Sequence, residues 1–239
     1  MPHFAELIEY ADGFDPSFSA SLVPATTAQI EQVEQLAGRN APDSYREFLE
    51  TMGQSTGWVK APPFDLRVDT VIEFYREGRW LSETAYFRIG EGTVFPIDHP
   101  HLEDLAFRDR LPEVIAIPDY AESSFRFELR GRRPICGSLL ELIGCPIFER
   151  FELKGKSRRP ERLGSAAQAP SALDSMQDYL LETGFELVFF STINGRYFTK
   201  KGAAIRAWQD YLHPLQAEVS ADSPVEQQHL VTALRQWIS

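Results

Sequence analysis

Apolar residues recur at three- and four-residue spacing in two adjacent stretches, 26–38 and 42–53, which predicts two amphipathic helices joined by a tight turn. Thr26 or Thr27 can cap the first helix through its hydroxyl, and Gly38 is suited to end it. The two apolar stripes consist of Ile30, Val33, Leu36 and Ala37 in the first helix and Tyr45, Phe48, Leu49 and Met52 in the second. We expect the rest of the chain to be organised around this helical pair.

In other stretches of the chain, the spacing of apolar residues matches either a helix or a strand. Helical spacing predicts helices at 3–11, after Asp69 or Thr70, at 172–182, at 202–212, and from Ser223–Pro224 onward. Alternation and β-prone residues predict strands within 84–97, 113–117, 124–129, 147–153 and 185–191, with a return strand from Tyr197–Phe198. Residues 138–143 fit a helical turn or a strand, because their length does not decide between them.

The order of these elements predicts the fold class. Strands that follow one another closely favour a largely antiparallel sheet with helices beside it, so the sequence predicts an α+β protein. Residues 156–171 pass from basic to small side chains and are predicted to form a linker or exposed loop. This segment would separate a larger domain, residues 1–155, from a smaller helix–hairpin–helix–helix extension, residues 172–239.

The order of side chains in the helical pair resembles the opening signature of the SUKH superfamily, the Smi/Knr-like proteins. The matching positions are Ile30, Val33, Glu34, Gly38, Pro42, Tyr45, Phe48, Leu49 and Gly53. The chain departs from the signature at Ala41, where the family usually has leucine, and at Met52, where it usually has asparagine. The resemblance spans residues 26–53 and implies a SUKH-like fold for residues 1–155.

The same resemblance implies a class of function. Many SUKH proteins resemble immunity proteins that bind and neutralise a cognate bacterial toxin, and others are regulatory or scaffold proteins. No catalytic residues come with the family. The resemblance therefore implies a non-catalytic immunity protein as the first hypothesis, and a regulatory or scaffold protein of the same fold, without a toxin partner, as the alternative.

Charge is distributed unevenly along the chain, whose net charge is −11. Residues 1–120 carry a net charge of −12, whereas residues 121–239 carry +1. An acidic surface disfavours direct nucleic-acid binding, which needs basic side chains, and it would steer a basic partner toward the N-terminal half. A basic cluster at 154–162 lacks interleaved aromatic residues, which favours a solvated loop over a nucleic-acid or membrane site.

Location and cofactors follow from what the sequence contains. No apolar run approaches the roughly 18 residues of a membrane span, and the acidic N-terminus does not resemble a secretory signal. Cys136 and Cys145 lie among apolar residues, which predicts ordinary buried thiols rather than a disulfide framework. We expect a cytoplasmic protein without a membrane partner or a cofactor.

Metal binding and catalysis are the alternatives to simple binding. His99 and His101, with nearby carboxylates, could hold a metal ion, but Pro100 between them indicates a loop, and an acidic loop facing a basic partner fits better. No nucleophile motif or phosphate loop is present in the sequence, so we expect no enzyme activity. A hydrolase using the Asp98–Asp104 loop remains a third hypothesis, and it predicts a deep pocket there.

The partner surface is predicted from exposed loops. Trp58 is either a loop aromatic folded back on the core or an interface anchor. The predicted partner-binding residues are Trp58, Glu91, Asp98, Glu103 and Asp104. We expect these carboxylates to speed the capture of a basic toxin domain, such as a nuclease.

Overall fold

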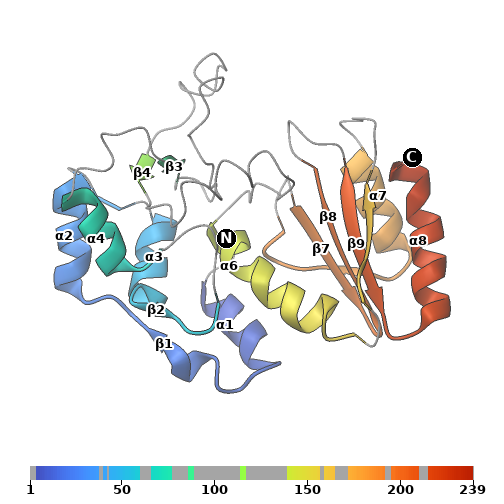
Figure 1. Ribbon diagram of the computed structural model, residues 1–239, viewed down its shortest axis with the longest axis horizontal. Helices are drawn as coiled ribbons and strands as arrows, with labels where there is room; N and C mark the ends of the chain where they lie inside the picture. The colour runs from blue at the N-terminus through green and yellow to red at the C-terminus, as the bar shows by residue number, and fades with distance from the viewer. Residues whose placement is uncertain are drawn as a thin grey trace, which may run out of the picture. The chain divides into compact units, whose positions relative to one another are not determined.

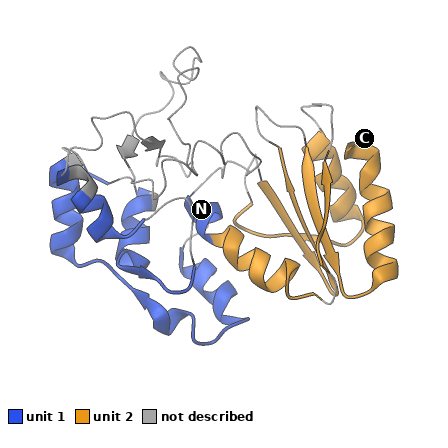
Figure 2. Cartoon of the chain, in the orientation of Figure 1, with its two compact units in different colours: residues 1–143 blue, residues 144–239 orange. Residues whose placement is uncertain are grey.

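The computed structural model describes residues 4–37, 40–41, 43–59, 66–76, 86–88, 114–116, 139–156, 159–164, 172–191, 195–209 and 215–238 (Figure 1). The chain divides into two compact units, residues 1–143 and 144–239 (Figure 2). Helix α6 (Leu139–Phe148) begins in the first unit and ends in the second. Helices and antiparallel sheets both contribute, which confirms the predicted α+β class.

Besides the start of α6, the described part of the first unit contains four α-helices. They are α1 (Phe4–Asp12), α2 (Thr27–Ala37), α3 (Asp43–Met52) and α4 (Val68–Arg76), with a short 3-10 helix, η1, at Ser19–Ser21. Two small antiparallel sheets accompany them, β1 (Leu22–Val23) with β2 (Ser55–Thr56) and β3 (Tyr86–Arg88) with β4 (Val114–Ala116). The helices predicted at 3–11, 26–38 and 42–53 are confirmed.

Helix α1 packs on α3 through aromatic and polar contacts. The Phe4 ring meets the Phe48 ring edge-on, with centroids 5.8 Å apart. The backbone N–H of Phe4 donates to Glu47 Oε1 at 2.9 Å, which satisfies one amide of the first turn of α1. Helix α2 is joined to α4 by Gln29, whose Nε2 donates to Asp69 Oδ1 at 2.8 Å. These contacts join α1 to α3 and α2 to α4.

The second unit is built on a five-stranded antiparallel sheet. Its strands, in spatial order, are β5 (Glu161–Gly164), β9 (Gln216–Ala221), β8 (Ala203–Trp208), β7 (Gly195–Lys200) and β6 (Glu186–Leu187). Helices α7 (Ala172–Glu182) and α8 (Pro224–Ile238) cover one face and share a hydrophobic core with it (Figure 1). The π-helical segment η4 (Glu149–Leu153), which continues α6, contacts β8 and β9. Strand β5 lies within the segment that was predicted as a linker.

Strand β8 corrects the prediction of a helix at 202–212, which is wrong for residues 203–208. Ala203, Ile205 and Ala207 belong to the core shared with α7 and α8, while the residues between them point to the opposite face. Every residue of β8 is buried, so the strand lacks the apolar–polar alternation that identifies a half-exposed strand. Gly202, with a φ of 83°, allows the tight turn that pairs Lys200 with Ala203.

One further strand prediction is wrong, and one strand is shorter than predicted. Residues 147–153 were predicted as a strand from the alternation in IFERFEL, but they form the end of α6 and the π-helical η4. Within 185–191, only Glu186–Leu187 form a strand. The helices predicted at 172–182 and from Ser223–Pro224 onward are confirmed, as is a strand within 113–117. The strand predicted at 124–129 lies outside the described residues.

Candidate functional site

The signature-like residues lie on α2 and α3, and most of those described point into the core. Gly38 and Pro42 lie outside the described residues. Ile30, Val33, Tyr45, Phe48 and Leu49 are buried. The Tyr45 and Phe48 rings are nearly parallel, 10° apart, with centroids at 6.0 Å. These residues therefore act in packing, and they leave the outer surfaces of the two helices for other roles.

Glu34 is the polar member of this set, and it connects the two helices. Its Oε1 atom accepts a hydrogen bond from the backbone N–H of Ala41 at 2.8 Å and also pairs with the guanidinium of Arg46. Ala41 lies in the connection between the helices, and Arg46 lies on α3. The Glu34 side chain is 14% exposed, whereas that of Arg46 is 40% exposed, so the shared carboxylate is more shielded from water than the guanidinium. Glu34 therefore links α2 to Ala41 and to Arg46 of α3.

Gly53, the last signature-like position, follows α3 and is buried. A Cβ atom built on it would lie 2.7 Å from the Leu49 carbonyl oxygen and 2.9 Å from the Ala25 Cβ. Its carbonyl oxygen accepts a hydrogen bond from the Val68 N–H at 2.7 Å, which joins α3 to the start of α4. Glycine is required here by the close approach of neighbouring backbone.

Replacing Glu34 by alanine should lower the free energy of unfolding by about 1.5–3 kcal/mol, because two hydrogen bonds to a carboxylate are lost. The matched control is Glu31→Ala on the same helix, where the side chain is exposed. The control should stay within about 0.5 kcal/mol of the parent. Hydrogen exchange of peptides from residues 26–53 measures the difference, and equal protection of both variants would show that Glu34 does not hold α2 and α3 together.

Trp58 is the one predicted partner-binding residue within the described part of the chain. Its ring lies against Phe18, with centroids 5.6 Å apart, and Phe18 itself is fully buried. The Trp58 side chain is half-buried. The indole therefore rests on the core while part of it faces solvent. The other predicted positions, Glu91, Asp98, Glu103 and Asp104, lie outside the described residues, as do His99 and His101.

Negative charge dominates the described surface of the first unit. Residues 4–76 contain 11 described Asp and Glu residues but only three described Arg residues and no described Lys. Glu6, Glu9, Glu31, Asp43 and Glu50 are exposed and come from three different helices. Such a surface raises the local concentration of a basic partner.

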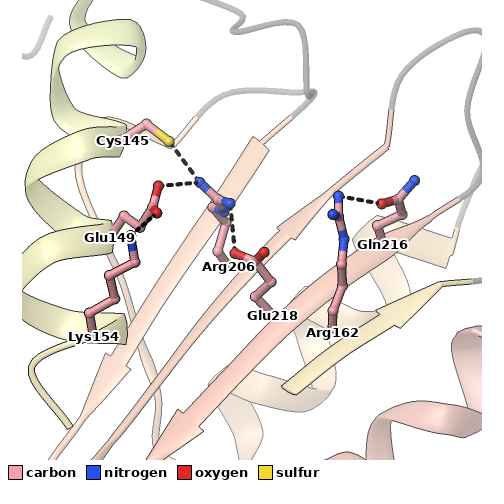
Figure 3. Close-up of polar contacts among 7 residues, drawn as sticks. All are labelled: Cys145, Glu149, Lys154, Arg162, Arg206, Gln216 and Glu218. Carbon is pink, nitrogen blue, oxygen red and sulfur yellow. Dashed lines mark hydrogen bonds and ion pairs between the residues drawn. The ribbon is translucent and has the colours of Figure 1, made fainter. Parts of the chain in front are cut away.

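A second polar cluster, which the sequence did not predict, surrounds Arg206 in the second unit (Figure 3). Arg206 lies on β8 directly opposite Glu218 of β9, and its Nη2 donates to Glu218 Oε2 at 2.6 Å. Its Nη1 donates to Cys145 Sγ at 2.9 Å and lies 3.8 Å from Glu149 Oε2. Lys154 Nζ pairs with Glu149 Oε1 at 2.6 Å. The cluster joins α6 and η4 to the face of the sheet opposite α7 and α8.

Trp208 and Arg162 extend this cluster along the sheet. The guanidinium carbon of Arg206 lies 4.9 Å from the centroid of the Trp208 ring, and that of Arg162 lies 5.2 Å from it. Arg162 Nη2 also donates to Gln216 Oε1 at 2.9 Å (Figure 3). Both guanidinium groups gain from the negative face of the indole ring. Part of the basic 154–162 segment is thus held by contacts within its own unit.

Burial alone lowers the pKa of the Arg206 guanidinium, because it disfavours the charged form. Electrostatic attraction outweighs burial and raises the pKa of Arg206 above its ordinary value. The groups responsible are Cys145, Glu218, Tyr197 and Glu149. The pKa of Arg206 is strongly basic in the unfolded chain and higher still in the folded protein. Arg206 is therefore charged in both states near neutral pH, and its contribution to stability does not change with pH in that range.

The Arg206 cluster therefore connects α6 and η4 to strands β8 and β9. Within it, the environment of Cys145 differs from the predicted one. That residue was predicted to be an ordinary buried thiol, yet it is half-buried and accepts a hydrogen bond from a guanidinium. Cys136 lies outside the described residues.

In the part of the chain that the structure describes, no group of three or more His, Cys, Asp and Glu residues could hold a metal ion. None of the described helices has the length and apolar character needed to cross a membrane.

No protein-family model, curated protein or solved structure matches the chain.

Proposed function

We propose that this chain is a non-catalytic binding protein that neutralises a cognate polymorphic bacterial toxin by direct binding. The observation that carries the proposal is the α2–α3 pair, which holds the described residues of the SUKH-like pattern. Ile30, Tyr45 and Phe48 are buried, and Glu34 ties α2 to the start of α3. Packing of these residues in one helical pair supports the resemblance to the SUKH signature, on which the proposed function rests.

The charge of the first unit supports a basic partner for this function. Its described helices expose many carboxylates and few cations. A nuclease toxin must itself carry basic side chains in order to bind phosphate groups. Electrostatic attraction would speed its capture, while aromatic anchors such as Trp58 would slow its release. The protein would act in the cytoplasm, without a cofactor.

A growth-rescue assay tests the proposal. The toxin domain encoded nearest to the gene is expressed in a sensitive host, with and without this protein. Rescue of growth, together with co-elution of the two purified proteins on a sizing column, would support neutralisation by binding. Failure to rescue, with no complex at micromolar concentration, would overturn the proposal.

The predicted acidic loop gives a sharper test of the surface. Replacing Asp98, Glu103 and Asp104 with their amides should slow association with the toxin about 10-fold at low salt, because electrostatic steering is reduced. The difference should shrink as salt is added, since screening already weakens the attraction. Stopped-flow fluorescence measures the association rate of the parent and of the variant at each salt concentration.

The matched control neutralises three exposed carboxylates of the second unit, Asp178, Glu182 and Glu186. This control removes the same charge from the chain, so it separates local steering from net charge. An equal loss of rate in both variants would contradict the assignment of the loop while leaving toxin binding itself intact.

A further inference from the structure

We draw no further inference here: the strongest candidate, the Cys145–Arg206 side-chain cluster between α6 and strand β8 of the second unit, consists of hydrogen bonds and ion pairs among its own members, and nothing in the described residues points to a ligand or reagent that the single thiol would meet.

Discussion

Replacing Arg206 by methionine is expected to lower the free energy of unfolding of the second unit by about 3–5 kcal/mol. The Arg206 side chain is 11% exposed and the Glu218 side chain is 19% exposed, so both charges lie mostly away from water. Removing the guanidinium would leave the Glu218 carboxylate without the partner that lies opposite it across the strands. An uncompensated charge at such a site is costly, because little water can take the place of the lost ion pair.

The expected loss has a matched control in the same unit. Arg235 pairs with Glu161 at 3.6 Å, but its side chain is 62% exposed. Arg235→Met should therefore change the free energy of unfolding by less than about 1 kcal/mol. Hydrogen exchange of peptides from residues 203–221, read by mass spectrometry in the full chain, measures the local stability of each variant. If both variants lost the same protection, the Arg206 cluster would not be what holds the sheet.

A double variant separates the ion pair from the general effect of removing a large side chain. Replacing Arg206 by methionine and Glu218 by leucine removes both charges and keeps similar volumes, so no carboxylate is left unpaired. Such replacements are often neutral or stabilising when both partners change together. We expect the double variant to be more stable than Arg206→Met alone, with a coupling energy that a double-mutant cycle reports. A double variant as unstable as Arg206→Met would mean that the lost contacts of Arg206 with Trp208, Cys145 and Glu149, not the unpaired Glu218 carboxylate, cause the loss.

The helices were predictable from the sequence because each buries one face and exposes the other. In α7, for example, Leu173, Met176 and Leu180 are buried, while Asp174 and Asp178 are exposed. This arrangement leaves a period of three to four residues in the sequence itself. Gly184, with a φ of 83°, then ends α7 in the left-handed conformation that glycine adopts most readily.

Strand β8 was not predictable in the same way, because both of its faces are covered. Helices α7 and α8 pack on one face, and η4 contacts the strand from the other. A strand buried on both faces carries apolar residues at successive positions, and its sequence then fits a helix as well. Arg206 stands in the middle of this apolar run, in AAIRAW, and a lone arginine there was the signal for a buried polar cluster. Its partner Cys145 is 61 residues away, and local periodicity carries no information about such a contact.

The signature-like residues show a related limit. Their spacing predicted two helices, which the structure contains. It did not predict that Glu34 would bond the Ala41 amide and the Arg46 guanidinium, because a carboxylate at this spacing also fits a solvated helix face. Sequence pattern places a residue on a face of an element, whereas the partner it meets depends on how the elements pack.

The second large effect is expected from Phe48→Ala, which should lower the free energy of unfolding of the first unit by about 3–5 kcal/mol. The Phe48 side chain is fully buried between Phe4 of α1 and Tyr45 of its own helix. Truncation to alanine would remove both ring contacts and leave a cavity that the surrounding helices fill only in part. Urea unfolding followed by hydrogen exchange of peptides from residues 4–12 and 43–52 measures the loss on both sides of the contact.

Leu36→Ala on α2 is the control for this prediction, because Leu36 belongs to the same predicted apolar stripes but is 36% exposed. It should cost far less than Phe48→Ala, since less apolar surface returns to water and no closed cavity forms. The pair also bears on the proposed function. If the signature-like residues act through the fold, Phe48→Ala should weaken toxin neutralisation only to the extent that it unfolds the first unit. Loss of toxin binding by a Phe48→Leu variant that remains folded would instead show that the ring shapes the binding surface directly.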